Sequence, residues 1–342
     1  MILPGGKRRR LRRYDHLPPL PDPAMSKPDL LLIAPIYPPA MAQLAAAYNL
    51  HRYWEAADKP ALLAQLAPLC VAAATSGGVG ITADMIKALP RLRMLSCFGV
   101  GYDGVDIDAC KAAGIKVSNT PDVLNECVAD TAWMLLLASV RRAVFNDKFV
   151  RSGAWLKGNA PLTDKVWGET LGIVGLGRIG KAIARRAEGF GMKIVYHGRS
   201  RQMDVAYDYY ADLVEMAKVA KVLLVITPGG RGTENIVNAR VLEALGKKGF
   251  LINVSRGSTV DDVALIKALQ EGSIAGAGLD VFVDEPRVPE AYLALDNVVL
   301  QPHVGSGTVA TRTAMGQLVV DNLEAWFNGK PLLTEVPETR AA

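Results

Sequence analysis

The chain of 342 residues contains only four histidines, so a side chain that exchanges protons near neutral pH can be sought by elimination. His16 lies in a proline-rich N-terminal tail, His51 lies inside a predicted strand, and His197 ends a strand that follows a glycine-rich turn. His303 remains, in the loop Pro302-His-Val-Gly-Ser306 at the end of another predicted strand. Functional residues are concentrated in such loops, so His303 is the candidate proton carrier.

Two charged residues follow other predicted strands: Arg256 in Asn253-Val-Ser-Arg-Gly257 and Glu285 in Asp280-Val-Phe-Val-Asp-Glu-Pro286. Because the carboxyl ends of parallel strands meet at one edge of a sheet, both can converge with His303. Such a set suits reduction of a 2-keto acid. Arg256 would bind the carboxylate and polarise the keto oxygen, His303 would protonate that oxygen, and Glu285 would orient the imidazole and favour its charged form. The alternative is three unrelated surface charges.

A glycine-rich turn lies between a short apolar run and an amphipathic one. Gly175, Gly177 and Gly180 form the pattern G-x-G-x-x-G after residues 171–174, and the apolar residues 192–196 close a βαβ unit of about 30 residues. The first glycine permits a tight turn, the second lets the backbone approach a pyrophosphate, and the third lets helix and strand pack closely. The unit predicts a dinucleotide site at the helix N-terminus, the alternative being a glycine turn without a nucleotide.

The end of the second strand of this unit indicates which dinucleotide binds. Sites that take NAD carry an acidic residue there, which binds the ribose 2′-hydroxyl. Here His197 ends the strand, and Gly198, Arg199, Ser200 and Arg201 follow. Arg199, Ser200 and Arg201 can hold a 2′-phosphate by charge-assisted hydrogen bonds, so we predict NADP, with NADPH preferred over NADH. The alternative is that these arginines are merely solvated.

The rest of the chain alternates between apolar runs and helical segments, which predicts an α/β fold. Strands are expected at residues 30–34, 48–54, 69–74, 92–98, 115–118, 171–174, 192–196, 222–227, 250–254, 275–279 and 298–300. The last six argue for a doubly wound parallel sheet. A final helix at 311–327 would return to the first domain. We therefore expect a discontinuous substrate-binding domain at 25–122 and 308–342, around a dinucleotide-binding domain at 123–307.

Residues 125–140 predict an apolar helix, and the part from Val128 to Val140 is apolar on more faces than one domain surface can bury. This pattern predicts an obligate homodimer. Residues 151–167 hold Trp155 and Trp167 but show little periodicity. Aromatic segments of this kind usually cover a site or contact another subunit.

Composition excludes several classes of protein. Half of the residues are apolar and 21% are charged. The chain therefore has enough apolar residues to form the cores of two domains. The net charge of +5 comes mostly from residues 1–24, where six basic residues accompany two acidic ones, so residues 25–342 carry only +1. We therefore expect no nucleic-acid partner. No apolar run reaches the ~18 residues of a membrane span, so we expect no membrane partner.

The basic, proline-rich residues 1–24 predict disorder, with Met25 as the true first residue.

The four cysteines, Cys70, Cys97, Cys110 and Cys127, show no C-x-x-C spacing. No cluster of His, Cys and Asp has the spacing of a metal site either. We therefore expect no metal, and we expect buried, reduced cysteines in a cytoplasmic protein.

Together these segments resemble the D-isomer-specific 2-hydroxyacid dehydrogenases and, within them, the glyoxylate/hydroxypyruvate reductases. The resemblance covers about residues 28–330, and its signatures are Gly99-Val-Gly-Tyr-Asp-Gly-Val-Asp106, Gly175-Leu-Gly-Arg-Ile-Gly180, Asn253-Val-Ser-Arg-Gly257, Leu279-Asp-Val-Phe282 with Glu285-Pro286, and Pro302-His-Val-Gly-Ser306. It implies two Rossmann-like, doubly wound parallel-sheet domains, the substrate domain being discontinuous and flavodoxin-like. It also implies NADPH-dependent reduction of small 2-keto acids (glyoxylate, hydroxypyruvate and larger 2-keto sugar acids) to D-2-hydroxy acids.

The resemblance further implies roles for particular residues. Arg256, Glu285 and His303 would form the catalytic set, backbone amides near Val100 and Gly101 would hold the substrate carboxylate, and Asp280 would face the nicotinamide amide. The expected substrate contacts are Ser76, Gly77, Val100, Gly101, Trp155, Arg256 and His303. The expected cofactor contacts are Gly175, Leu176, Gly177, Arg178, Ile179, His197, Gly198, Arg199, Ser200, Thr227, Pro228, Thr233, Val254, Ser255, Arg256, Asp280, His303, Gly305 and Ser306.

A homodimer joined through the helix from Asn125 is also implied, with Trp155 placed to reach the partner's active site. The chain differs from the formate dehydrogenases of this superfamily at Glu285, because those enzymes carry glutamine at this position. A non-enzyme alternative exists: some relatives are NAD(H)-sensing transcriptional corepressors that keep the catalytic set. Steady-state turnover with glyoxylate or hydroxypyruvate separates the two classes.

Overall fold

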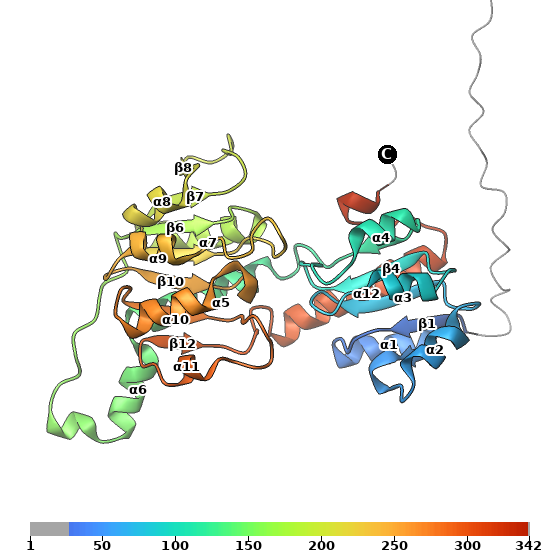
Figure 1. The fold of residues 1–342 in the computed structure, drawn as a ribbon, viewed down its shortest axis with the longest axis horizontal. Helices are drawn as coiled ribbons and strands as arrows, with labels where there is room; N and C mark the ends of the chain where they lie inside the picture. The colour runs from blue at the N-terminus through green and yellow to red at the C-terminus, as the bar shows by residue number, and fades with distance from the viewer. Residues whose placement is uncertain (1–26, 341–342) are drawn as a thin grey trace, which may run out of the picture.

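The structure, a computed structural model, describes residues 27–340, so the predictions for residues 1–24 and Met25 lie outside the described residues. Two parallel sheets lie side by side and are joined by the long helix α12 (Val309–Phe327) and by the chain that precedes α5 (Asn125–Val140) (Figure 1). Within residues 27–340, no helix is long and apolar enough to cross a lipid bilayer.

The first sheet has five parallel strands. Their order is β2 (Asn49–Arg52), β1 (Asp29–Leu32), β3 (Ala72–Ser76), β4 (Met94–Phe98) and β5 (Lys116–Ser118). This is the flavodoxin-like order, 2-1-3-4-5, that was predicted. The central strands are runs of Leu, Ala and Met buried on both faces, as parallel sheets covered by helices require. The covering helices include α1 (Pro38–Ala47), α2 (Lys59–Leu66), α3 (Ala83–Ala88) and α4 (Ile107–Ala112).

The second sheet has seven parallel strands. Their order is β12 (Val298–Leu300), β11 (Gly276–Leu279), β10 (Phe250–Asn253), β9 (Val222–Val225), β6 (Thr170–Val174), β7 (Lys193–His197) and β8 (Asp208–Tyr210). The strand order reverses between β9 and β6, which is where doubly wound sheets bind nucleotides. The helices of this domain are α7 (Arg178–Gly189), α8 (Leu213–Val219), α9 (Ala239–Leu245), α10 (Asp262–Gln270) and α11 (Glu290–Leu293). The predicted doubly wound fold is confirmed.

One strand of this sheet was not predicted. β8 contains only the three residues Asp-Tyr-Tyr, and it pairs with β7 at the edge of the sheet. A three-residue edge strand has too few residues to show a period-two pattern, so neither its length nor its composition distinguishes it from a loop.

Helix α12 returns the chain to the first domain. It packs against α1 so closely that a Cβ at Gly316 would lie 2.8 Å from Ala40 Cβ. After α12, Glu335 forms an antiparallel bridge with Ser118 at the end of β5. The five-stranded domain is therefore built from two separate parts of the chain.

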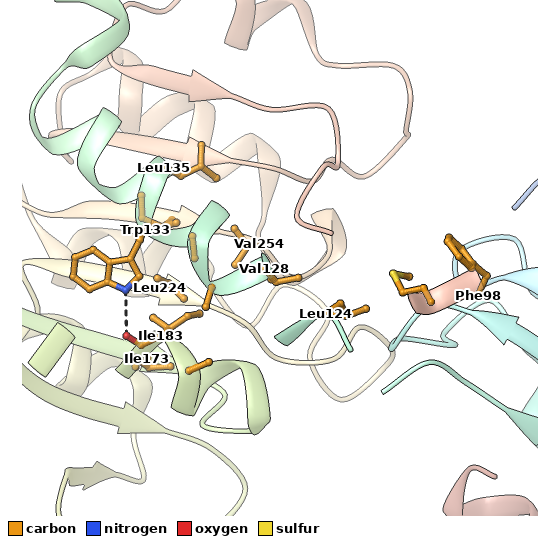
Figure 2. Close-up of a cluster of buried hydrophobic side chains, with 14 of the residues drawn as sticks. Phe98, Leu124, Val128, Trp133, Leu135, Ile173, Ile183, Leu224 and Val254 are labelled. Atoms are coloured by element: carbon orange, nitrogen blue, oxygen red, sulfur yellow. Dashed lines mark hydrogen bonds between the residues drawn. The ribbon is translucent and has the colours of Figure 1, made fainter. Parts of the chain in front are cut away.

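Most of the apolar surface of α5 packs inside its own domain, so its apolar pattern does not by itself require a partner. α5 lies against α7 and the strands β10 and β11 of its own chain. Ser139 donates a hydrogen bond to Ala277 O on β11 (3.1 Å), and Trp133 Nε1 donates one to Ile183 O on α7 (3.1 Å). Figure 2 shows this second bond as a dashed line within the buried cluster formed by Val128, Trp133 and Leu135 of α5 with Ile173, Ile183, Leu224 and Val254. The apolar faces of α5 thus belong to the domain core.

An arm follows α5. It consists of α6 (Ala143–Arg151), a 3₁₀ turn at Ala154–Lys157 and an extended segment that leads to β6. In Figure 1 the arm extends from the seven-stranded domain at the end away from the other domain. Its exposed apolar side chains are Val144, Val150, Trp155, Leu156, Leu162 and Trp167, of which Leu156 and Leu162 are 93% and 99% exposed. An exposed apolar surface of this kind is typical of a protein contact.

Candidate active site

Arg256, Glu285 and His303 lie in the loops that follow the neighbouring strands β10, β11 and β12. The three strands pair in parallel, so the loops leave the sheet at the same edge. The first two loops are in direct contact, because a Cβ at Gly257 would lie 2.0 Å from the carbonyl carbon of Phe282. Only a glycine lets the chain pass so close, and the result is that residues from three strands share one site.

Glu285 and His303 form a hydrogen-bonded pair. Nδ1 of His303 lies 2.7 Å from Oε2 of Glu285, while Oε1 of Glu285 accepts a 3.0 Å hydrogen bond from the backbone N–H of Phe282. Burial alone would raise the pKa of the Glu285 carboxyl, but the hydrogen bonds from His303 and Phe282 outweigh it and hold this pKa below its ordinary value. Glu285 is therefore ionised at neutral pH, and it leaves Nε2 of His303 as the ring nitrogen that can meet a substrate.

The loop that carries His303 is held by Asp280. The carboxylate of Asp280 accepts hydrogen bonds from Val304 N and Gly305 N (2.8 Å each), and its backbone oxygen accepts one from His303 N (2.8 Å). His303 has φ 54°, in the left-handed region that non-glycine residues rarely occupy. Burial raises the pKa of Asp280, although these hydrogen bonds oppose the shift. In the structure Asp280 therefore stabilises a strained backbone that presents the histidine.

Arg256 is held at its backbone and at its guanidinium. Asn253 Nδ2 donates to the backbone oxygen of Arg256 (3.0 Å), and Arg256 Nη1 donates to Ser255 O (2.8 Å). Arg256 Nε lies 3.1 Å from both carboxylate oxygens of Asp103, which belongs to the five-stranded domain. The side chain of Arg256 is 26% exposed, so the guanidinium is half-buried where the two domains meet.

The loops expected to hold a substrate carboxylate pack against each other. A Cβ at Gly77 would lie 2.0 Å from Gly101 O, and Gly104 N donates to Gly77 O (3.0 Å). Among residues 27–340, the backbone N–H groups of Val100 and Gly101 have no hydrogen-bond acceptor. A Cβ at Gly101 would lie 2.2 Å from Arg256 Nη2. Two free amides therefore lie beside a guanidinium, which is a suitable arrangement for a carboxylate.

The glycine-rich turn forms a cradle before α7. Gly175 has φ 101°, and a Cβ there would lie 2.9 Å from Ile226 O; a Cβ at Gly180 would lie 2.3 Å from Gly175 O. A Cβ at Gly177 would meet nothing within 4 Å, so this glycine faces open space at the N-terminus of α7, where no side chain caps the helix. The unfilled space and the uncapped N–H groups suit a pyrophosphate, so the residues fit a dinucleotide.

The loop after β7 presents two exposed arginines. Neither Arg199 nor Arg201 has an ion-pair partner in the part of the chain that the structure describes, although the Arg201 guanidinium lies 5.8 Å from the ring centre of Tyr209. Gln202 fixes this loop: its backbone N donates to Tyr196 Oη and its side-chain Nε2 donates to Leu176 O in the glycine-rich turn (2.7 Å each). Nothing in the sequence pattern had pointed to Gln202.

Other expected cofactor residues are distributed around this edge. Ser255 Oγ donates to Thr227 O, and Thr233 Oγ1 donates to Pro228 O (2.6 Å). Arg178 Nε lies 3.2 Å from Asp122 Oδ1, in the chain between the two domains. The side-chain ring of His197 is bound to Tyr210 O on β8 through Nδ1 (2.9 Å). Ile179, Gly198 and Ser306 are half-buried, and Leu176, Val254 and Gly305 are buried.

Trp155 lies on the exposed arm, and the single chain does not bring it to the other site residues, so its contact with a partner's active site stays a prediction. Cys70, Cys97 and Cys110 are buried as expected, and burial raises their pKa values to about 11, 12 and 12, but Cys127 is only half-buried. No group of His, Cys, Asp and Glu within residues 27–340 is arranged to hold a metal ion.

The sequence is similar to that of known 2-hydroxyacid dehydrogenases and reductases. Residues 133–305 match a family model described as the NAD binding domain of D-isomer specific 2-hydroxyacid dehydrogenases. Over 307 residues, which are 90% of this chain and 98% of the relative, the sequence is 48% identical to glyoxylate/hydroxypyruvate reductase A of Arabidopsis thaliana. The same identity and coverage are found with hydroxyphenylpyruvate reductase of Plectranthus scutellarioides.

A solved structure is similar over its whole length. It is the NADPH-dependent glyoxylate/hydroxypyruvate reductase of Sinorhizobium meliloti in complex with NADP and malonate, and it superposes with a TM-score of 0.86 and 48% identity. The similarity covers 93% of this chain and 100% of that chain. The similarity therefore extends over both domains.

Proposed function

Since this chain belongs to the D-isomer-specific 2-hydroxyacid dehydrogenase family, we propose that it reduces small 2-keto acids to D-2-hydroxy acids with NADPH. The substrates that we propose are glyoxylate, hydroxypyruvate and larger 2-keto sugar acids. The observation that carries the proposal is the Glu285–His303 pair on the sheet edge that also presents Arg256. The relatives named as glyoxylate/hydroxypyruvate reductases support the substrate class, and the NADPH-dependent relative supports the cofactor.

The chain's own residues would act as follows. The free amides of Val100 and Gly101 bind the substrate carboxylate, and Arg256 binds the carboxylate and polarises the keto oxygen through its terminal nitrogens. His303 donates a proton from Nε2 to that oxygen, and Glu285 stabilises the charged imidazole through Nδ1. The nicotinamide, when bound at the edge formed by β6 and the loops after β9 to β12, supplies the hydride.

Steady-state kinetics with the purified chain tests this function. We expect NADPH oxidation that depends on glyoxylate or hydroxypyruvate, with a kcat of roughly 1 to 10³ s⁻¹, in the ordinary range of enzymes. A panel that adds 2-keto sugar acids and hydroxyphenylpyruvate ranks the substrates. A chain that binds NADPH but reduces none of these acids would contradict the assignment and favour a cofactor-sensing role.

The preference for NADPH depends on the loop after β7, so Arg199→Ala should raise the KM for NADPH by roughly fivefold and leave the KM for NADH nearly unchanged. The reason is that Arg199 is exposed without a carboxylate partner among residues 27–340, so its charge is free for a 2′-phosphate. Arg240→Ala is a matched control, because it removes an exposed arginine from α9 of the same domain, outside the loops expected to hold the cofactor. Equal kcat/KM values of the wild type for NADPH and NADH would refute the preference.

We also propose a cytoplasmic homodimer. The support for a dimer is the arm, whose exposed Trp155, Leu156 and Leu162 need a partner surface. In such a dimer Trp155 would reach the other subunit's active site. The four cysteines are free, which suits a reducing compartment. The domain boundaries that we propose remain 25–122 with 308–342 for substrate binding and 123–307 for the dinucleotide.

A further inference from the structure

We infer that Asp103 is a positioning residue for the reduction: it holds Arg256 across the domain junction so that the terminal guanidinium nitrogens face the substrate. This inference rests on the proposed function and adds a residue to it. Nothing in the sequence pattern assigns a role to Asp103. Its carboxylate comes from the five-stranded domain, whereas Arg256 comes from the seven-stranded domain.

Asp103 contacts the guanidinium of Arg256 through Nε rather than through a terminal nitrogen. Both oxygens of Asp103 lie 3.1 Å from Nε of Arg256, the one nitrogen on the chain side of the guanidinium. Nη1 is bound to Ser255 O, and Nη2 approaches the Cα of Gly101. Asp103 thus leaves Nη2 directed toward the loop whose amides at Val100 and Gly101 are free. A carboxylate that blocked the site would instead pair with the terminal nitrogens.

Asp103 lies in a loop that is hydrogen-bonded to its own domain through residues on both sides of it. On one side Tyr102 Oη donates to the carboxylate of Glu338 (3.0 Å to Oε2), and on the other Gly104 N donates to Gly77 O (3.0 Å). Earlier in the loop, Gly99 N donates to Thr120 Oγ1 (3.1 Å). These bonds tie the loop to the five-stranded domain. The position of Asp103 therefore follows the position of the whole domain.

Both domains approach the ion pair closely. A Cβ at Gly101 would lie 2.2 Å from Arg256 Nη2 and 2.8 Å from Asp103 Oδ1. A Cβ at Gly229 would lie 2.9 Å from Arg256 Cγ and 3.5 Å from Asp103 Cγ. One glycine from each domain therefore lies against the pair, whose side chains are 26% and 28% exposed. Arg256 makes these contacts only while the two domains are together.

Removing Asp103 should change the affinity for a substrate carboxylate in one direction if Asp103 positions Arg256, and in the opposite direction if only its charge matters. Asp103 is negative and lies beside the cation that binds an anionic substrate, so removing its charge would by Coulomb's law alone tighten carboxylate binding. Removing a positioning residue instead weakens binding, because the guanidinium then samples other rotamers. We therefore expect Asp103→Ala to raise the Kd of oxamate, an inert 2-keto acid analogue, about tenfold in the NADPH-loaded enzyme, and to raise the KM for glyoxylate similarly.

The experiment uses the full chain and isothermal titration of oxamate, with NADPH affinity measured separately. Asp103→Asn is the second variant: it has the same shape, and it should weaken oxamate binding by a smaller factor of about threefold. Asp108→Asn is the matched control, because Asp108 is exposed nearby on α4 and is not among the side chains that bond Arg256. The affinity for NADPH should change less than twofold in all three variants.

A double variant distinguishes action through Arg256 from collapse of the loop. Arg256→Lys has no Nε, so Asp103→Ala should change oxamate affinity less than twofold in that background. An equal loss in both backgrounds, or unchanged or tighter binding in Asp103→Ala alone, overturns the inference. If the wild type reduces no 2-keto acid, the proposed function fails first. If the wild type is active and Asp103→Ala matches it, only the inference fails.

Discussion

Replacing His303 with alanine should lower kcat for 2-keto acid reduction by roughly 10²-fold or more at every pH, while NADPH binds nearly as well as before. The keto oxygen needs a proton when the adjacent carbon is reduced, and His303 is the one imidazole on this edge that a carboxylate holds through Nδ1. Its removal leaves proton transfer to water. Steady-state kinetics from pH 5 to pH 9, with NADPH affinity from fluorescence titration, measures both quantities.

His51→Ala is the matched control. His51 is also paired with a carboxylate, because its Nε2 lies 2.6 Å from Asp29 Oδ1, but it lies on the edge strand β2 of the other domain. This variant should keep kcat within about twofold of the wild type, since it removes no group from the site. If His303→Ala retains more than a tenth of the wild-type kcat, another group donates the proton.

The parts of the site that follow from local pattern were predictable from the sequence. β10, β11 and β12 fall within apolar runs of the sequence, and each is followed by a polar loop. Parallel strands deliver their following loops to one edge, so the grouping of Arg256, Glu285 and His303 could be inferred without coordinates. The turn from Gly175 to Gly180 was recognisable for the same reason.

The parts that depend on contacts distant in sequence were not predictable. α5 was interpreted as needing a partner because its apolar faces are visible in the sequence. The sequence does not mark Gly278 of β11, which lies against Leu135 and Ser139 of α5, as a contact of this helix. The ion pair of Asp103 with Arg256 joins residues 153 positions apart in different domains. The carboxylate of Asp280 accepts two backbone hydrogen bonds from the loop that carries His303. These bonds likewise depend on how two loops distant in sequence pack together.

The charge of Glu285 should contribute to the rate of the reaction. In the proposed reduction His303 gives a proton to the keto oxygen, and Glu285 holds the imidazole through Nδ1. The hydrogen bonds from His303 and Phe282 N overcome the effect of burial and lower the pKa of Glu285, so its carboxylate stays charged down to a lower pH than that of an ordinary glutamate. This negative charge, 2.7 Å from Nδ1, fixes the orientation of the ring.

In Glu285→Gln the negative charge beside Nδ1 of His303 is lost, and the hydrogen bonds change as well. Glutamine has one acceptor oxygen, so it cannot serve both Phe282 N and His303 Nδ1. We expect kcat/KM for glyoxylate to fall about tenfold at neutral pH. The measurement is steady-state kcat/KM for glyoxylate.

Glu285→Asp separates the loss of charge from the loss of geometry, because it keeps the charge and shortens the reach. Its kcat/KM should fall through poorer geometry, but by less than that of Glu285→Gln. If kcat/KM of Glu285→Gln instead matches that of the wild type, Glu285 is not the partner on which His303 depends. Asp280, the other carboxylate bonded to the His303 loop, could not then take its place without releasing Val304 N and Gly305 N, because its carboxylate already accepts both.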